Sequence, residues 1–558
     1  MMRINRRVGS RTRLLAALAA LSLAAVGSIS PAVAGEKEGM CWPGETLDQC
    51  SGDLGHGLGK FDLRVPVNFN GTVLLFFHGI RFGRNTPILK SLKAVGINYD
   101  NDPAYNSVTI PGLGDAWIGN GKVDLAAGGS NDLANAMMKQ GFAVAGLGYG
   151  DTQGWAVQEA YAAGQAMVKK LRSGYVYGER RVIVWGESMG TLPALKLAES
   201  MPQVSAAYAE CVVPPSTQVT FQQALDALYV LKVLGGLDLK LTYDPGQAGL
   251  MEAYSDLGKV LSLLGAIKAN ANAVTSTKLL ARNVVLLAGL IGGLPEASAN
   301  YDGITTGGPF LASQLNTSAA MAENIGGAAV LATLLRFDVE SRIRFAGGLA
   351  TGSANFTDNV NTSYTDLLSD EQRAQYETFL NLGGTDVVDQ MLGALDASKG
   401  DATMRYVANP AAVAAAKAVF PEYTGVARVP TMLVGYEVDP VTQAGQVARY
   451  VDRSVAGRAV SKRHHLPLAM AAYAAAPADG WTVLGDPAAT AARRTSGIGH
   501  CGSASALTGP QHVALMSAFN QWLYAGDTTG LAAVNAVRYD TQLGFQADPE
   551  WLPAEVKY

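Results

Sequence analysis

Residues 181–190 read RVIVWGESMG, and this stretch decides the fold. Its first half is rich in β-branched and aromatic residues, which is typical of a short buried strand. Its second half is a Gly-x-Ser-x-Gly motif centred on Ser188, the one match in the sequence. A strand that leads into this motif, with a helical segment directly after it, is the sharp turn that lifts a serine hydroxyl above a sheet. The stretch therefore predicts that Ser188 is a nucleophile.

On both sides of this stretch, strand-like and helix-like segments alternate. Strands are predicted at Thr72 to Phe77, Phe142 to Leu147, Arg181 to Trp185 and Val204 to Cys211. Helices are predicted at Asn131 to Gln140, Val157 to Leu171 and Leu192 to Glu199. Continuous apolar runs of this kind suit strands that are buried on both faces of a sheet. The alternation predicts an α/β fold with a doubly wound, mostly parallel sheet.

The alternation stops near Pro214, and sheet-like sequence returns at Val429 to Gly435. Residues 214–424 are rich in Ala, Leu and Gly and are predicted to be mainly helical. They are far longer than an ordinary loop of about 12–15 residues. We therefore expect one core, made of residues 35–213 and 425–558, with a helical insertion at 214–424.

An apolar run within the insertion, Leu280 to Leu294, has two interpretations. It can line an acyl-chain pocket or touch a lipid surface, or it can be a helix buried inside the insertion. Apolar runs are more often core than binding site, so we expect a buried helix.

Three further motifs accompany the serine motif in the chain. His78-Gly79 ends the first predicted strand, Tyr436-Glu437-Val438-Asp439-Pro440 follows the strand at 429–435, and Gly497 to Gly502 surrounds His500 before a last helix at Gln511 to Tyr524. In this order the motifs resemble the α/β-hydrolase superfamily of esterases, lipases and peptidases. The resemblance covers about residues 60–212 and 425–525. It implies that the insertion forms a cap over an active site.

The resemblance also implies a catalytic triad in the chain order serine, acid, histidine. Serine needs a base to remove its proton, and His500 is the expected base because its loop of small residues leaves the imidazole room. The adjacent pair His464 and His465 is the alternative, while His512 is expected in the first turn of the last helix. Asp439 is the expected acid. Glu437 is the alternative.

An oxyanion hole is required, because negative charge develops on the carbonyl oxygen of the substrate. By the same resemblance, one backbone N–H comes from Met189 and another from Gly79 or Ile80. These roles belong to the backbone. No C-x-x-C pair and no histidine-rich cluster indicates a metal site, and we expect neither a metal nor a cofactor.

The first 34 residues have the features of a secretory signal peptide. Five arginines precede an apolar run from Leu14 to Val26, and Ala32-Val33-Ala34 is a typical cleavage site. The apolar run is too short for a membrane anchor of about 20 residues. We expect a protein that is secreted, to the periplasm or beyond the cell, after cleavage near Ala34.

Removal of this segment leaves 38 basic and 47 acidic residues, a formal net charge of −9. An acidic surface argues against nucleic acid or anionic lipid as a partner. No later span of 18 apolar residues is evident, so we expect no stable membrane insertion.

The sequence has four cysteines, and an even number in an exported chain suggests two disulfides. Three pairings are possible. Cys41 and Cys50 are close in sequence and would close a small loop, which leaves Cys211 with Cys501. Cys501 directly follows His500, so the second bridge would clamp the loop of the expected base.

Three functions remain open at this point. The first is a serine hydrolase that cleaves small or polymeric carboxylic esters through an acyl-enzyme. The second is an exported serine peptidase, such as an aminopeptidase, on the same fold. The third is a catalytically inactive binding protein, against which the complete set of Ser188, Asp439 and His500 argues.

Overall fold

The structure, a computed structural model, describes the following residues: 40–44, 50–83, 106–110, 114–119, 123–151, 154–213, 217–269, 276–293, 325–349, 353–370, 373, 387–421, 423–436, 439, 441–442, 445, 447, 449–450, 453, 468–475, 500, 509–525, 536–537 and 545–546. The expected signal peptide, residues 1–34, lies outside these ranges. Almost all described residues belong to one unit, Cys41–Tyr558.

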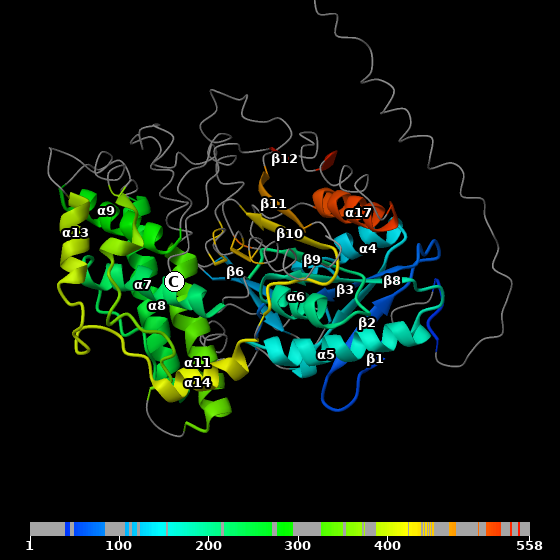
Figure 1. Cartoon of the computed structure of the whole chain (residues 1–558), viewed down its shortest axis with the longest axis horizontal. Coiled ribbons are helices and arrows are strands. Elements are labelled where there is room, and N and C mark those ends of the chain that lie inside the picture. Colours follow the sequence, from blue (N-terminus) through cyan, green and yellow to red (C-terminus); the bar gives the residue numbers. More distant parts are fainter. Residues whose placement is uncertain are drawn as a thin grey trace, which may run out of the picture. The chain divides into compact units, whose positions relative to one another are not determined.

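The centre of this unit is a nine-stranded sheet of described strands (Figure 1). In spatial order the strands are β1 (Gly52–Asp53), β2 (Lys60–Arg64), β7 (Ala143–Leu147), β3 (Thr72–Phe77), β8 (Arg181–Glu187), β9 (Ala206–Glu210), β10 (Thr431–Tyr436), β11 (Leu468–Ala475) and β12 (Phe545–Gln546). The six strands from β7 to β11 are parallel to their neighbours, and β1, β2 and β12 pair antiparallel. The predicted doubly wound, mostly parallel sheet is confirmed.

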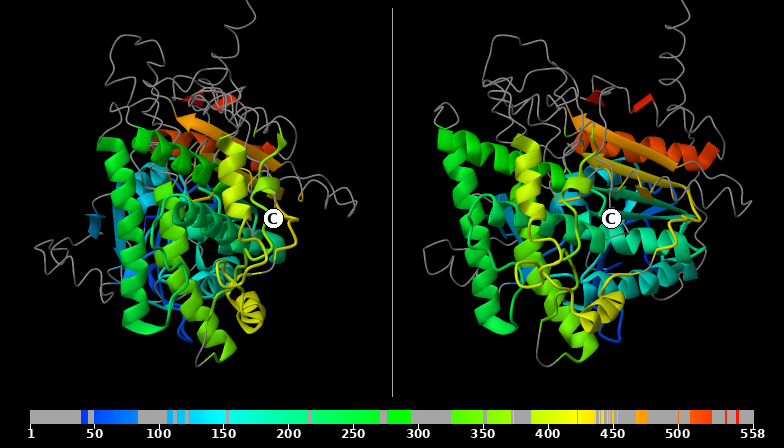
Figure 2. Two further views of the ribbon diagram at one scale, coloured as in Figure 1. Left: turned by 90° about the vertical axis from the view of Figure 1, so that its left-hand side faces the viewer. Right: turned by 60° about the vertical axis from the view of Figure 1, so that its left-hand side comes forward.

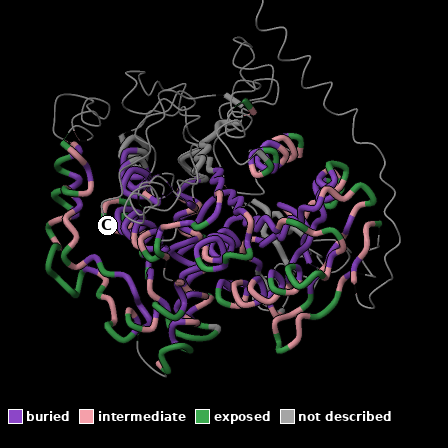
Figure 3. The backbone as a smooth tube through the Cα atoms, turned by 45° about the vertical axis from the view of Figure 1, so that its right-hand side comes forward, coloured by how far each residue is buried: buried purple, intermediate pink, exposed green. Residues whose placement is uncertain are grey.

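Alternate side chains of each strand point to opposite faces of the sheet, and both faces are covered by helices. Val73, Leu75 and Phe77 of β3 join an apolar cluster with α5 (Val157–Lys170) and α6 (Thr191–Ser200). Leu74 and Phe76 join a second cluster with α4 (Asn131–Lys139) and α17 (Gly509–Ala525). Figure 3 shows the central strands as buried. This explains why the strands read as continuous apolar runs.

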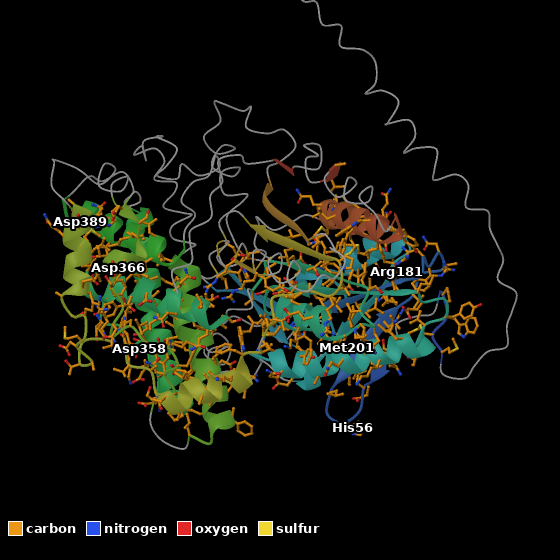
Figure 4. The ribbon with its side chains drawn as sticks, in the orientation of Figure 1. His56, Arg181, Met201, Asp358, Asp366 and Asp389 are labelled. Carbon is orange, nitrogen blue, oxygen red and sulfur yellow. A yellow bond between two sulfur atoms is a disulfide. The ribbon has the colours of Figure 1, made fainter. Side chains whose placement is uncertain are left out.

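A local cap fixes the start of helix α4, and a long-range contact attaches helix α17 to the sheet. The Ser130 hydroxyl accepts a hydrogen bond from the Leu133 N–H and so caps the start of α4. At the other end of the sheet, the Arg181 guanidinium lies 3.7 Å from the centroid of the Tyr524 ring in α17, and Figure 4 labels Arg181 beside this helix. The last helix is thereby attached to the first residue of β8.

The described residues between β9 and β10 contain helices and no strand. Among the α-helices are α7 (Thr217–Val233), α8 (Gly246–Ala269), α9 (Ser276–Ile291), α11 (Arg336–Gly347), α13 (Val387–Asp396) and α14 (Pro410–Val419). Figure 2 shows several of them running alongside one another, coloured green to yellow. Since β9 and β10 are neighbours in the sheet, the chain leaves for the insertion and returns to the adjacent position.

The apolar run in the insertion forms most of α9 and is buried. Val284, Val285, Leu287 and Ala288 are each at most 2% exposed, and α9 packs against α7. The expected buried helix is confirmed, and the alternative of a lipid-facing run is wrong for these side chains.

The insertion shares one apolar cluster with the core. The Trp155 ring, just before α5, packs edge-on against Phe221 of α7 and against Phe420. The Trp155 N–H also donates to a carboxylate oxygen of Asp338 in α11 at 2.6 Å. An aspartate from the insertion therefore accepts from the backbone just ahead of α5, a helix whose own N-cap residue, Ala156, makes no such bond.

Several strands were not predicted from the sequence. The antiparallel strands β1, β2 and β12 are among them, and the segment between β3 and α4 contains a small sheet of β4 (Phe82–Gly83), β5 (Asn106–Ile110) and β6 (Gly114–Gly119). Strand β11 was not expected, because its alanine-rich sequence lacks the β-branched residues that mark the other strands. Among the described residues, no helix is both long and apolar enough to cross a membrane.

The chain has a disulfide between Cys41 and Cys50, with their Cα atoms 5.3 Å apart. Cys211 is also disulfide-bonded. Its partner lies outside the described residues, and so does Cys501. The pairing of these two cysteines stays a prediction.

Candidate active site

Ser188 lies at the turn between β8 and α6. Its φ is 52°, a conformation that non-glycine residues rarely adopt. The flanking glycines make the turn possible: a methyl group on Gly190 would come within 2.1 Å of the Phe77 carbonyl oxygen, and one on Gly186 within 2.6 Å of the Gly190 carbonyl oxygen. The Thr191 hydroxyl donates to the Ser188 carbonyl at 2.7 Å. These contacts hold the serine at the carboxyl end of the central strand.

The structure brings Ser188, His500 and Asp439 together. The Ser188 hydroxyl oxygen is 2.6 Å from His500 Nε2. His500 Nδ1 is 3.0 Å from each carboxylate oxygen of Asp439. One oxygen of Asp439 also accepts the N–H groups of Val441 and Thr442, each at 2.8 Å. These backbone N–H groups hold the Asp439 carboxylate in place, and the carboxylate orients the His500 imidazole toward the Ser188 hydroxyl.

The loop after β3 runs directly beside the serine. A methyl group on Gly79 would lie 3.1 Å from Ser188 Cβ and 3.6 Å from its hydroxyl oxygen. A side chain on Gly79 would crowd Ser188, so the glycine favours this close approach of the backbone. Met189, directly after the serine, is buried in the short 3-10 turn Ser188–Gly190. Gly79, Ile80 and Met189 therefore stand on the two backbone segments that meet at Ser188.

The loop after β3 is itself held by polar groups. His78 Nδ1 is 2.7 Å from the Gly79 carbonyl oxygen. Burial, followed by the nearby Arg81 guanidinium, holds the pKa of His78 well below its ordinary value. The imidazole is therefore neutral, with the proton on Nδ1, because a carbonyl can only accept. Arg81 forms a buried ion pair with Asp124.

A pair of buried carboxylates lies behind the serine. Glu187 and Glu210 stand opposite each other in the β8–β9 register. Burial raises the pKa of Glu187, although its carboxylate accepts the Gly128 N–H at 2.9 Å. Burial, and then the Glu187 carboxylate, raise the pKa of Glu210 well above its ordinary value. The two carboxyls therefore disfavour each other's ionised form, and the effect is larger on Glu210.

The remaining candidates from the sequence are placed as follows. His512 is in the first turn of α17, as expected, and its Nδ1 lies 3.2 Å from Glu210 Oε2, not beside Ser188. Burial lowers the pKa of His512 to about 4, so its imidazole is uncharged near neutral pH. Glu437, His464 and His465 lie outside the described residues. Among the described residues, no group of three metal-binding side chains comes together.

The sequence did not single out Glu187, Arg81, Asp124 or Tyr149, all of which are buried around Ser188. A sequence signal was available for Glu187 and Arg81. Each is a charged residue at the end of an apolar strand or a few residues after one, where burial is costly unless the charge is paired. Asp124 carried no local signal, because its partner is 43 residues away in the chain.

Comparisons with known proteins give distant structural similarity. No protein-family model matches the chain, and no curated protein matches its sequence. The chain is similar to feruloyl esterase B from Aspergillus oryzae, with 11% identity and a TM-score of 0.31 over 72% of this chain and 66% of that one. It therefore spans slightly less than two thirds of that esterase.

Two other solved structures are similar to the chain at comparably low sequence identity. One is the rice cell wall degrading esterase LipA from Xanthomonas oryzae, with 12% identity and a TM-score of 0.28 over 77% of this chain and 80% of that one. The other is juvenile hormone epoxide hydrolase from the silkworm Bombyx mori, with 14% identity and a TM-score of 0.17 over 68% of this chain and 65% of that one.

The fold assignment rests on the chain's own architecture. An antiparallel strand is followed by six parallel strands, a serine stands on a sharp turn after the central strand β8, and an aspartate and a histidine follow later in the chain. The glycine-containing loop after the neighbouring strand β3 passes beside the serine. The chain has the fold of the α/β-hydrolases.

Proposed function

We propose that the protein is a serine hydrolase that cleaves carboxylic esters, with Ser188 as nucleophile, His500 as general base and Asp439 as the acid that orients it. The observation that carries this proposal is the continuous hydrogen-bonded series from the Ser188 hydroxyl through both ring nitrogens of His500 to Asp439. A serine hydroxyl is a weak nucleophile, and an adjacent oriented base is what activates it.

In the proposed mechanism, His500 Nε2 takes the hydroxyl proton as Ser188 attacks the ester carbonyl carbon. The developing oxyanion is stabilised by the Met189 N–H and by an N–H of Gly79 or Ile80. The protonated His500 then gives its proton to the leaving alcohol, which leaves an acyl-enzyme at Ser188. Water, activated by the same imidazole, releases the acid and restores the serine.

Ester cleavage is favoured over aminopeptidase activity by the state of the nearby acidic groups. An aminopeptidase needs a carboxylate that is available to bind the substrate amine. Glu187, next to Ser188, is buried and accepts the Gly128 N–H. Asp124 is buried in an ion pair with Arg81. Each of these two carboxylates already has a partner.

The site of action proposed here is outside the cytoplasm. The Cys41–Cys50 disulfide supports this, because disulfides persist in oxidising compartments and are rare in the cytosol. The insertion between β9 and β10 is proposed to act as a cap that shapes the substrate site. Its attachment through Trp155 and Asp338 supports a cap that is fixed to the core.

A direct comparison of substrates tests the proposed function. We expect purified protein to hydrolyse p-nitrophenyl acetate or butyrate and to be much slower with aminoacyl p-nitroanilides. A preference for the anilides supports the peptidase instead. No turnover of either class, by protein shown to be folded, contradicts an enzymatic function.

A further inference from the structure

Tyr149 stands out among the buried residues near the site. It follows β7 directly after Gly148 and is fully buried, with 0% exposure. Its φ is 50°, in the left-handed region that bulky side chains rarely adopt. A residue in such a conformation costs about 1–3 kcal/mol, and it persists only where its surroundings require it. The strained conformation therefore indicates that contacts of the Tyr149 side chain hold it in place.

Those contacts all lie on the loop after β3. The Tyr149 hydroxyl donates to the His78 carbonyl oxygen at 3.1 Å. Its ring stacks on the His78 imidazole, with ring centroids 4.0 Å apart and planes at 24°. The Phe77 ring is farther away, at 6.5 Å. Burial raises the pKa of Tyr149 well above its ordinary value, so the hydroxyl keeps the proton that it donates.

These contacts determine which way two peptide groups face. In a trans peptide the C=O and the next N–H point in opposite directions across one rigid plane. The Tyr149 hydroxyl holds the His78 carbonyl, and so it sets the direction of the Gly79 N–H. The His78 imidazole, on which the Tyr149 ring stacks, holds the Gly79 carbonyl and so sets the direction of the Ile80 N–H.

We propose that Tyr149 is a positioning residue for the oxyanion hole: its hydroxyl and its ring fix the two peptide planes that present the N–H groups of Gly79 and Ile80 beside Ser188. The proposal rests on the proposed function, since those N–H groups matter only if an oxyanion forms at Ser188. Tyr149 touches no reacting atom, and it acts through His78 and the loop.

The test is the Tyr149→Phe variant of the full chain, which keeps the stacked ring and removes only the hydroxyl. Loss of an oxyanion donor costs about 10²–10³ in kcat, and loosening one costs less. We expect kcat for a p-nitrophenyl ester to fall about tenfold with KM little changed. Affinity for a boronic acid, which mimics the tetrahedral oxyanion, is expected to fall by a similar factor.

A matched control is Tyr175→Phe. The Tyr175 hydroxyl also donates to a backbone carbonyl, that of Cys50 at 2.7 Å. Tyr175 precedes the amino end of β8, whereas Ser188 follows its carboxyl end. The control therefore loses the same kind of bond away from the site, and we expect its kcat and boronic acid affinity to match the wild type.

The outcomes separate the two proposals. Wild-type protein that hydrolyses esters, with Tyr149→Phe equal to it in kcat and in boronic acid affinity, overturns the positioning role alone. An equal fall in kcat in Tyr149→Phe and Tyr175→Phe also overturns it, because the effect is then a general loss of stability. Folded wild-type protein without esterase activity overturns the proposed function, and this inference with it.

Discussion

At the scale of single residues, the proposed chemistry depends on how neighbouring groups hold the side chains of Ser188 and His500. Ser188 is held in a left-handed conformation by the tight packing of Gly186 and Gly190. His500 is fixed between Ser188 and Asp439 by bonds at both ring nitrogens. Positioning of this kind supplies much of the rate enhancement of an enzyme, since the reacting groups need not be ordered during the reaction.

The role of His500 can be separated from the adjacent histidines. We predict that His500→Ala lowers kcat by about 10⁴ or more, because the serine loses its base. The double variant His464→Ala/His465→Ala is expected to remain close to wild-type activity. Steady-state hydrolysis of a p-nitrophenyl ester measures both. An active His500→Ala together with an inactive double variant would reverse the assignment.

At the scale of elements, the packing of helix α5 against the sheet depends on a glycine that allows the helix to approach closely. Gly164 of α5 faces the sheet, where a methyl group would come within 2.7 Å of the Phe77 ring and 2.9 Å of Leu197 in α6. A glycine in the middle of a helix costs about 0.5–1 kcal/mol relative to alanine. The close packing that this glycine allows offsets that cost.

We predict that Gly164→Ala destabilises the protein by about 1–3 kcal/mol, since the added methyl overpacks the interface with β3. Gly258→Ala is the matched control, because Gly258 is an exposed position of α8 where an added methyl group would meet no atom within 4 Å. That control is expected to stabilise by about 0.5–1 kcal/mol. Urea unfolding measures both changes, and a stabilised Gly164→Ala would contradict this packing.

The elements differ in how far the sequence predicted them. The strand at Thr72–Phe77 has the predicted bounds, and α4 and α5 each end one residue earlier than expected. These elements carry strong local signals, namely apolar runs between turn residues and a serine cap. Strand β11 and the small sheet β4–β6 were missed, because alanine-rich and short strands are specified by their pairing partners.

At the scale of the whole molecule, the insertion and the core are joined by shared burial. A continuous apolar cluster includes Val73 of β3, Trp155 before α5 and Phe221 of α7. The insertion was predictable as a helical segment from its composition. Its attachment was not, because the contact between Trp155 and Asp338 joins residues 183 positions apart. Likewise Ser188, Asp439 and His500 were chosen by chain order and motif, whereas Asp124 and Tyr149 required the fold.

Buried histidine also makes the stability of the molecule depend on pH. Burial lowers the pKa of His512 from 6.5 to about 4 in the folded state. The unfolded chain therefore binds this proton more readily, and the stabilisation present above pH 6.5 is lost as the pH falls toward 4. Glu210 acts in the opposite direction: burial, and then the Glu187 carboxylate, raise its pKa, and a raised carboxyl pKa favours the folded state as the pH falls.

We predict that His512→Gln, which removes this titration, reduces the loss of unfolding free energy between pH 7 and pH 5 by about 2 kcal/mol. His56→Gln is the control, because His56 is exposed on the loop between β1 and β2. Denaturant unfolding at both pH values gives the difference. An identical pH dependence in His512→Gln and wild type would show that His512 is not buried in its neutral form.

The most direct test of the central claim is covalent labelling of the nucleophile. An alkyl fluorophosphonate reacts with a serine only where a base and an oxyanion hole activate it. We predict one adduct per chain, on the peptide that contains Ser188. We expect none in Ser188→Ala, and ester hydrolysis by that variant to be reduced by about 10⁴–10⁶. Labelling at another residue, or a folded Ser188→Ala that keeps more than about a tenth of wild-type activity, would contradict this claim.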